Sequence, residues 1–286
     1  MAHRIEFKRM VLGLPLSVTD YEMVGVTVKL AELLRLNLVA MFVEDRGLID
    51  MAGLPCVREL RAFGSGWQPI EIGQLTTELE RASATAHRLF ANIARNCSVE
   101  TSFRVEKGSA ADVIGSLATA EDIVVIIEPR NPVERVSQQF TRLIDAAFQA
   151  SASVMIIPCR VARSAGPIVA VAIDPDDPSI NTALRIAAAA HEKLIVVSPS
   201  EDLESNASLA TLIASAGVRV EFVRSRKGQI RATSLADDLQ QFNERLIVTN
   251  RGTLTDSEAP TLASLRSTPV VIVEPVYSAN ARPPTY

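Results

Sequence analysis

The stretch from Glu244 to Pro275 decides the fold. It reads ERLIVTNRG (244–252), then a short polar loop, then TDSEAPTLASLRS (255–267) and TPVVIVEP (268–275). Short aliphatic, β-branched runs on both sides of a helix-forming segment predict a strand, a turn, a helix and a second strand. The same plan occurs at 122–158, where DIVVIIEPRNP (122–132) precedes a helical segment and ASVMIIP (152–158). Two copies of this strand–turn–helix–strand segment in one chain predict a duplicated α/β domain.

Strands and helices are expected to alternate along the rest of the chain. The expected strands are residues 9–14, 38–43, 99–105, 123–127 and 154–157 in the first half, and 168–173, 194–197, 218–223, 246–249 and 270–273 in the second. Alternation with helices implies parallel strands joined by right-handed crossovers. The sequence therefore predicts an α/β fold of two tandem Rossmann-like domains, each a five-stranded parallel sheet flanked by helices.

A polar linker, CRVARSAG (159–166), marks the predicted domain boundary. It separates a first domain, 1–160, from a shorter second domain, 167–276, and residues 277–286 are expected to form a disordered tail. The first domain carries a Gly-rich insertion at about 44–73, which a long helix follows. One face of that helix is apolar. We expect this face to pack on its own sheet, with a dimer seam as the alternative.

Composition excludes several functional classes. The net charge of −4 offers no general attraction to nucleic acid, and no apolar run approaches the length of a membrane helix. The three cysteines, Cys56, Cys97 and Cys159, are far apart, which favours reduced thiols in a cytoplasmic protein. The three histidines have no metal-ligand spacing, and the chain contains no P-loop, Rossmann fingerprint or nucleophile elbow. These observations predict neither an enzyme nor a metal protein.

Several segments together carry a family resemblance. They are VAVAIDPDDPSINTALRIAAAA (169–190), Gly108 and Gly228 after the third strand of each half, and the paired endings ASVMIIP and TPVVIVEP. Their order resembles the universal stress protein (UspA-like) family in its tandem form. FVED (42–45) and LIDMAGLPCVREL (48–60) are similar to an insertion common in bacterial members. The resemblance covers nearly the whole chain and rests on order and spacing.

The resemblance implies a fold and a ligand. The fold would be adenine nucleotide alpha hydrolase-like in each half, with strand order 3-2-1-4-5. The last strands would pair, either between the two halves of one chain or in a homodimer. Many members bind ATP or AMP through an Asp after the first strand, a Gly-x-x-Gly turn after the fourth, and a later Gly-Ser/Thr. Members are implicated in stress response, usually without an established reaction.

The second half keeps part of this ligand motif. The candidate ATP or AMP residues are Asp174, Asn250, Arg251 and Gly252. Thr255 stands where the second glycine would be, and with Glu258 it has the spacing of a capping box, which would occupy the donors of the helix N-terminus. The alternatives are a strand-end turn for Asp174 and a positive-φ turn for Gly252.

The first half departs further from the motif. Leu14-Pro15 stands where the adenosine-binding Asp would be, and Glu128-Pro129-Arg130-Asn131-Pro132 replaces the glycine turn. Pro129 and Pro132 have no N–H to donate to a phosphate, and the negative charge of Glu128 would repel it. Arg130 and Arg135, with Arg142 nearby, are a possible anion site that uses side chains instead. The alternative is that they are solvated arginines on a helix face.

The sequence thus predicts a tandem universal stress-type protein with a non-enzymatic regulatory or interaction role and an unknown protein partner. Its nucleotide motif is degenerate in both halves. The first rival hypothesis is an ATP- or AMP-binding stress sensor that uses the second half. The second rival is an enzyme of a related adenine-handling fold, which no acid, base or nucleophile constellation supports.

Overall fold

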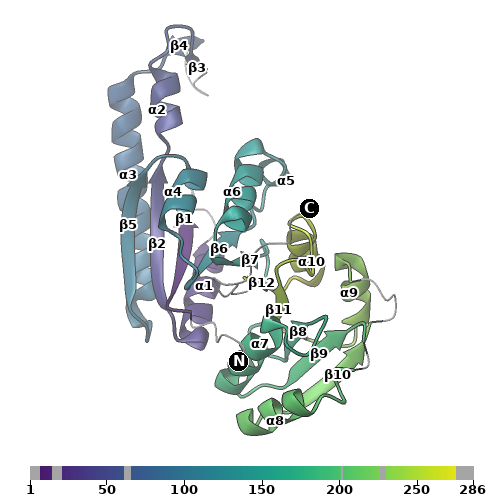
Figure 1. The fold of residues 1–286 in the computed structure, drawn as a ribbon. Helices are drawn as coiled ribbons and strands as arrows, with labels where there is room; N and C mark the ends of the chain where they lie inside the picture. Colours follow the sequence, from purple (N-terminus) through teal and green to yellow (C-terminus); the bar gives the residue numbers. More distant parts are fainter. Residues whose placement is uncertain (1–6, 15–20, 61–65, 201, 226–229, 275–286) are drawn as a thin grey trace.

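The computed structural model describes residues 7–14, 21–60, 66–200, 202–225 and 230–274. Its main feature is one ten-stranded sheet in the order β10-β9-β8-β11-β12-β7-β6-β1-β2-β5. All neighbouring pairs in it are parallel except β7 with β12, which run antiparallel. The predicted α/β fold with a mostly parallel sheet is therefore confirmed (Figure 1).

The strands fall into two sets of five neighbours. Residues before the linker supply β1 (Arg9–Leu14), β2 (Asn37–Glu44), β5 (Thr101–Lys107), β6 (Asp122–Ile127) and β7 (Ser153–Ile157). Residues after it supply β8 (Ile168–Val171), β9 (Leu194–Ser198), β10 (Val220–Arg224), β11 (Leu246–Asn250) and β12 (Val270–Val273). At the joint, Val270 pairs with Ile156 and Ile272 with Val154.

Helices cover both faces of the sheet. One apolar layer lies under α1 (Tyr21–Leu34), α3 (Ile72–Ile93), α7 (Pro178–Ala190) and α8 (Ala207–Ala216). The other lies under α4 (Ala110–Leu117), α6 (Gln138–Gln149), α9 (Ala232–Asp238) and α10 (Glu258–Arg266). Strands covered on both sides read as continuous apolar runs, which is why β7, β9 and β12 are buried throughout.

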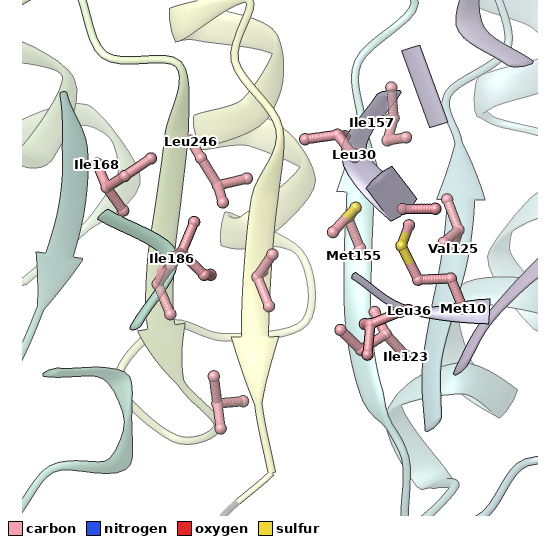
Figure 2. Close-up of a cluster of buried hydrophobic side chains, with 14 of the residues drawn as sticks. Met10, Leu30, Leu36, Ile123, Val125, Met155, Ile157, Ile168, Ile186 and Leu246 are labelled. Carbon is pink, nitrogen blue, oxygen red and sulfur yellow. The ribbon is translucent and has the colours of Figure 1, made fainter. Parts of the chain in front are cut away.

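Each apolar layer crosses the joint between the two sets of strands. Figure 2 shows Met10, Ile123 and Val125 from the first half in the same cluster as Ile168 and Leu246 from the second. The layer on the opposite face likewise joins residues of α6 to residues of α9 and α10. The two halves therefore share their cores.

The Gly-rich insertion forms elements of its own. It contains α2 (Arg46–Ala52) and an antiparallel hairpin of β3 (Arg58–Leu60) and β4 (Trp67–Pro69). These elements lie at one end of the molecule, beside the start of α3 (Figure 1). One face of α3 packs on the sheet, as expected, and Ala86 and Phe90 lie on it, whereas Ile72 at its first turn is exposed.

Local capping signals predict helix starts well. Asn131 and Asp177 each precede a proline, the common pattern of an N-cap followed by Pro at the first helical position, and they cap α5 (Pro132–Arg135) and α7. Helix α8 begins at Ala207, because the Asn206 side chain accepts from the Leu209 N–H. The strand expected at 168–173 ends at Val171. Pro15, Gly228 and the tail 277–286 lie outside the described residues.

Candidate functional site

A cavity of about 610 Å³ lies at the carboxyl ends of β8, β9 and β11. Parallel strands place their ends at one sheet edge, and β8 and β11 are neighbours whose helices leave on opposite faces, so this is the switch point of the second half. Both apolar and polar residues line it. The lining residues that matter most here are Ile173, Ile230, Arg231, Gly252, Thr253 and Glu258.

Gly252 and Thr253 form the floor of the cavity after β11. Gly252 has φ +96°, so the prediction of a positive-φ turn is confirmed, and a Cβ there would meet nothing within 4 Å. The Thr253 side chain is 8% exposed, and its Oγ1 has no hydrogen-bond partner among the described residues. A buried hydroxyl without a partner is costly, which is typical of a position that a ligand or water satisfies.

The N-terminus of α10 borders the cavity but offers phosphate little. The N–H groups of Glu258 and Ala259 both donate to the Thr255 carbonyl, at 3.0 and 3.2 Å, and Pro260 has no N–H. The predicted capping box forms only in part. Glu258 accepts from the Thr255 N–H at 3.1 Å, but the Thr255 hydroxyl donates to the same carboxylate and caps no N–H.

Asp174 is exposed and is not among the residues that line this cavity. Its Oδ1 accepts from the Asp176 N–H at 2.9 Å, a local turn of the kind expected after a strand. The neighbouring Asp177 is buried, and its two carboxylate oxygens accept from the N–H groups of Ser179 and Ile173. The pKa of Asp177 is raised, because burial disfavours its charged form. The hydrogen bonds from Ser179 and Ile173 favour the charged form and offset part of this rise.

Arg251 points away from the cavity and across the joint. Its guanidinium donates to the Ala152 carbonyl at 2.8 Å, pairs with Glu274 and lies over the Phe148 ring. Burial raises the pKa of Glu274, and the nearby Arg251 charge opposes that shift. Asn250 ends β11 and also does not line the cavity. Of the four candidate nucleotide residues, the structure thus brings only Gly252 to the cavity wall.

The corresponding turn of the first half also contacts the other half. Glu128 follows β6 and is 5% exposed; both its carboxylate oxygens accept from the Ser264 hydroxyl, at 2.9 and 2.7 Å. Glu128 and Arg251 each stand directly after the fourth strand of a half, where the family motif has its glycine turn. Both side chains serve contacts between the halves.

The structure brings the predicted arginines Arg130 and Arg135 together. Arg135 donates to the carbonyls of Pro129 and Arg130, at 2.7 and 3.3 Å, and to the Cys159 sulfur at 3.3 Å. Arg130 pairs with Glu22 at 3.0 Å. Arg142 is exposed on α6 and does not join them.

Sequence reasoning missed Thr253, Ile230 and Arg231 as cavity residues. Thr253 directly follows Gly252, but the glycine motif of this turn assigns no role to the residue at that position. Ile230 and Arg231 enter the cavity because α9 packs beside α10, which the chain order alone does not indicate. In the described part of the chain, there is no group of His, Cys, Asp and Glu that could hold a metal ion, and no helix is long and apolar enough to cross a bilayer.

Comparison with solved structures identifies the fold. A universal stress protein from Archaeoglobus fulgidus DSM 4304 aligns with 95% of this chain and 98% of its own, with a TM-score of 0.62 and 14% identity. A putative universal stress protein from Pseudomonas aeruginosa UCBPP-PA14 and a functionally unknown protein from P. aeruginosa PAO1 both align with a TM-score of 0.51 and 15% identity. They cover 94% of this chain, and the aligned shares of their own chains are 94% and 93%.

No protein-family model matches the sequence, and no curated protein matches it. The structural likenesses extend over most of the chain and support the resemblance inferred from its motifs. The chain has the fold of the universal stress proteins.

Proposed function

We propose that this chain is a tandem member of the universal stress protein family with a non-enzymatic regulatory or interaction role. The N-terminus of α10 carries this proposal. Its first two N–H groups are bonded to Thr255, its third helical residue is Pro260, and Glu258 adds a carboxylate. A phosphate there would find no free donor among the first three helical residues and a repelling charge. The tandem organisation is supported by two successive sets of five neighbouring strands.

The role of the two turns supports the same proposal. The side chains of Glu128 and Arg251 make hydrogen bonds between the halves. Either turn would have to break these bonds in order to rearrange around a ligand. A protein partner then remains as the object of regulation. The free cysteines, Cys56, Cys97 and Cys159, favour a reducing, cytoplasmic setting.

A second candidate is an ATP- or AMP-binding sensor in the second half. The observation that favours it is the cavity of about 610 Å³ with the open Gly252 backbone and the unpartnered Thr253 hydroxyl. A volume of this size is typical of small-molecule sites. Arg231 at its wall supplies a positive charge that could face a phosphate.

The experiment that separates the two candidates measures bound and added nucleotide. The purified protein is denatured and any released nucleotide identified, and the native protein is titrated with ATP and AMP by calorimetry. The regulatory proposal expects no released nucleotide and no saturable heat. Saturable binding that Thr253→Val or Asp174→Ala weakens, while Thr211→Val on the exposed face of α8 leaves it unchanged, overturns it in favour of the sensor.

A further inference from the structure

A second cavity of about 740 Å³ lies at the joint, at the carboxyl ends of β6 and β7. Its walls come from three parts of the chain. Glu22 belongs to α1, Arg130 follows β6, and residues 159–162 belong to the linker after β7. The second half contributes Ser267, the C-terminal cap of α10, whose carbonyl accepts from the Ala162 N–H at 2.9 Å. Both halves and the linker thus build one site.

The charge of this second cavity is positive. Arg130 and Arg160 line it, and Arg135 stands behind the Cys159 thiol, to which it donates at 3.3 Å. Arg160 is exposed and makes no hydrogen bond or ion pair with any described residue. The lining carboxylate is Glu22, which pairs with Arg130, whereas Glu128 is turned to Ser264. The two lining guanidinium groups, Arg130 and Arg160, against the one lining carboxylate, Glu22, leave an excess of one positive charge, with Arg135 behind them.

We propose that this second cavity binds a phosphate-bearing small molecule through the side chains of Arg130 and Arg160. A phosphomonoester carries close to two negative charges at neutral pH, so a positively charged lining attracts it. Guanidinium groups bind phosphate oxygens through paired N–H donors, so no glycine turn is required. The cavity volume suits a small metabolite. The site is separate from the cavity beside Gly252 and does not depend on nucleotide binding there.

Glu22 competes with the phosphate for Arg130. Its side chain is 70% exposed, so it can rotate into solvent when an anion takes its place. The ion pair holds Arg130 at the cavity wall and lowers the net affinity, because it must break on binding. Replacing Glu22 by Gln therefore strengthens binding.

The Cys159 thiol lines the cavity and reports occupancy directly. Its alkylation by iodoacetamide is followed by mass spectrometry, with and without inorganic phosphate or AMP as probes. Cys56 and Cys97, which do not line the cavity, serve as internal references. If the occupied site is closed to the reagent, the Cys159 rate falls by a factor of 1 + [L]/Kd, about elevenfold at ten times Kd. The reference cysteines keep their rates.

Variants localise the effect. Each is compared with itself, with and without probe, so that changes in the intrinsic Cys159 reactivity cancel. We expect Arg160→Ala to weaken protection by roughly tenfold or more in apparent Kd, as for the loss of a hydrogen bond to a charged group. Glu22→Gln lowers the apparent Kd, and Arg142→Ala, an exposed arginine outside the cavity, leaves it unchanged.

Two results overturn the proposal. One is an unchanged Cys159 rate at saturating concentrations of both probes; the other is protection that Arg160→Ala and Glu22→Gln leave unaltered. Thr253→Val separates this site from the cavity of the second half. Protection of Cys159 that persists in Thr253→Val belongs to the joint, whatever happens to nucleotide binding at the other cavity.

Discussion

Asp122 shows how one buried carboxylate fixes the start of β6. It is 1% exposed and accepts from Arg9 at 2.6 and 2.9 Å and from the N–H and hydroxyl of Thr119 at 2.8 and 2.9 Å. Burial alone would raise the pKa of Asp122, but the hydrogen bonds from Arg9 and Thr119 outweigh it, and the pKa lies below its ordinary value. The pair joins β1 to β6.

We expect Asp122→Asn to lower the free energy of unfolding by about 2 kcal/mol at pH 7. This is less than for a fully buried pair, because the Arg9 side chain is 31% exposed. Since the folded pKa is lowered, the stabilisation is present above about pH 4 and is lost as the pH falls through the folded pKa. Urea unfolding at several pH values tests this.

The matched control for Asp122→Asn is Asp145→Asn, at an exposed position of α6 without a bonded partner among the described residues. It should leave stability within about 0.5 kcal/mol of the parent. A difference between Asp122→Asn and the parent that stays constant down to acid pH would contradict the linkage.

Gly166, at the end of the linker, stands where the backbone leaves no room for a side chain. It has φ +128°, and a Cβ there would lie 2.1 Å from the Asn243 carbonyl oxygen. We expect Gly166→Ala to cost about 2 kcal/mol or more of unfolding free energy, since the backbone must move. Gly115→Ala in α4, where a Cβ meets nothing within 4 Å, should instead be neutral or stabilise by about 0.5–1 kcal/mol. Equal effects of the two substitutions in urea unfolding would refute the steric argument.

At the scale of elements, α10 is held by the ion pair of Arg266 with Glu244. Glu244 is fully buried and the Arg266 side chain is 11% exposed, with Nε–Oε1 at 2.8 Å and Nη2–Oε2 at 2.9 Å. Arg266 also donates to the carbonyls of Leu239 and Phe242, so it ties α10 to the end of α9. The same helix borders both cavities, through Glu258 at its start and Ser267 after its end.

Removing the Glu244 carboxylate leaves the Arg266 charge in the protein interior without its ion-pair partner. We expect Glu244→Gln to lower the unfolding free energy by about 3 kcal/mol, measured by urea unfolding. Glu204→Gln, at an exposed position without a bonded partner among the described residues, should change it by less than about 0.5 kcal/mol. Replacing both partners by apolar residues should recover much of the loss, and a double variant as unstable as Glu244→Gln would contradict this explanation.

Helix starts and strands were predictable from the sequence where they depend on a few neighbouring residues. The caps at Asn131 and Asp177 and the apolar runs of β6 and β12 depend on a few adjacent residues, and the sequence indicates them correctly. The partners of Glu128 and Arg251 were not predictable, because Ser264 and Ala152 lie about a hundred or more residues away along the chain. The capping box of Thr255 formed only in part because helix α10 begins at Glu258, two residues later than a Thr255 N-cap requires.

At the scale of the whole molecule, the shared cores couple the two halves. Both apolar layers contain residues from before and after the linker, and α1 contacts α7 across the joint. The candidate cavities lie on opposite edges of the sheet, because β7 and β12 run antiparallel. The composition of either half alone gives no sign of this arrangement.

We expect thermal unfolding in one cooperative transition, because neither half can lose its packing without exposing the core of the other. Differential scanning calorimetry should give a calorimetric enthalpy close to the van't Hoff enthalpy. Ile272→Asp, which places a charge in the buried β7–β12 joint, should lower the temperature of that single transition. Two resolved transitions in the parent protein would show that the halves unfold independently.

The two sides of the β7–β12 joint are encoded separately in this chain. In a dimer of identical subunits, every residue at a symmetric joint appears twice, so any substitution there is made on both sides at once. Here the residue after β6 is Glu128 and its counterpart after β11 is Arg251, and each has a different set of contacts. Two identical subunits would carry the same residue at both positions and could not present one acidic and one basic side chain. Because the two halves are joined in one chain, a substitution can alter the residue at one end of the joint while the other end keeps its own.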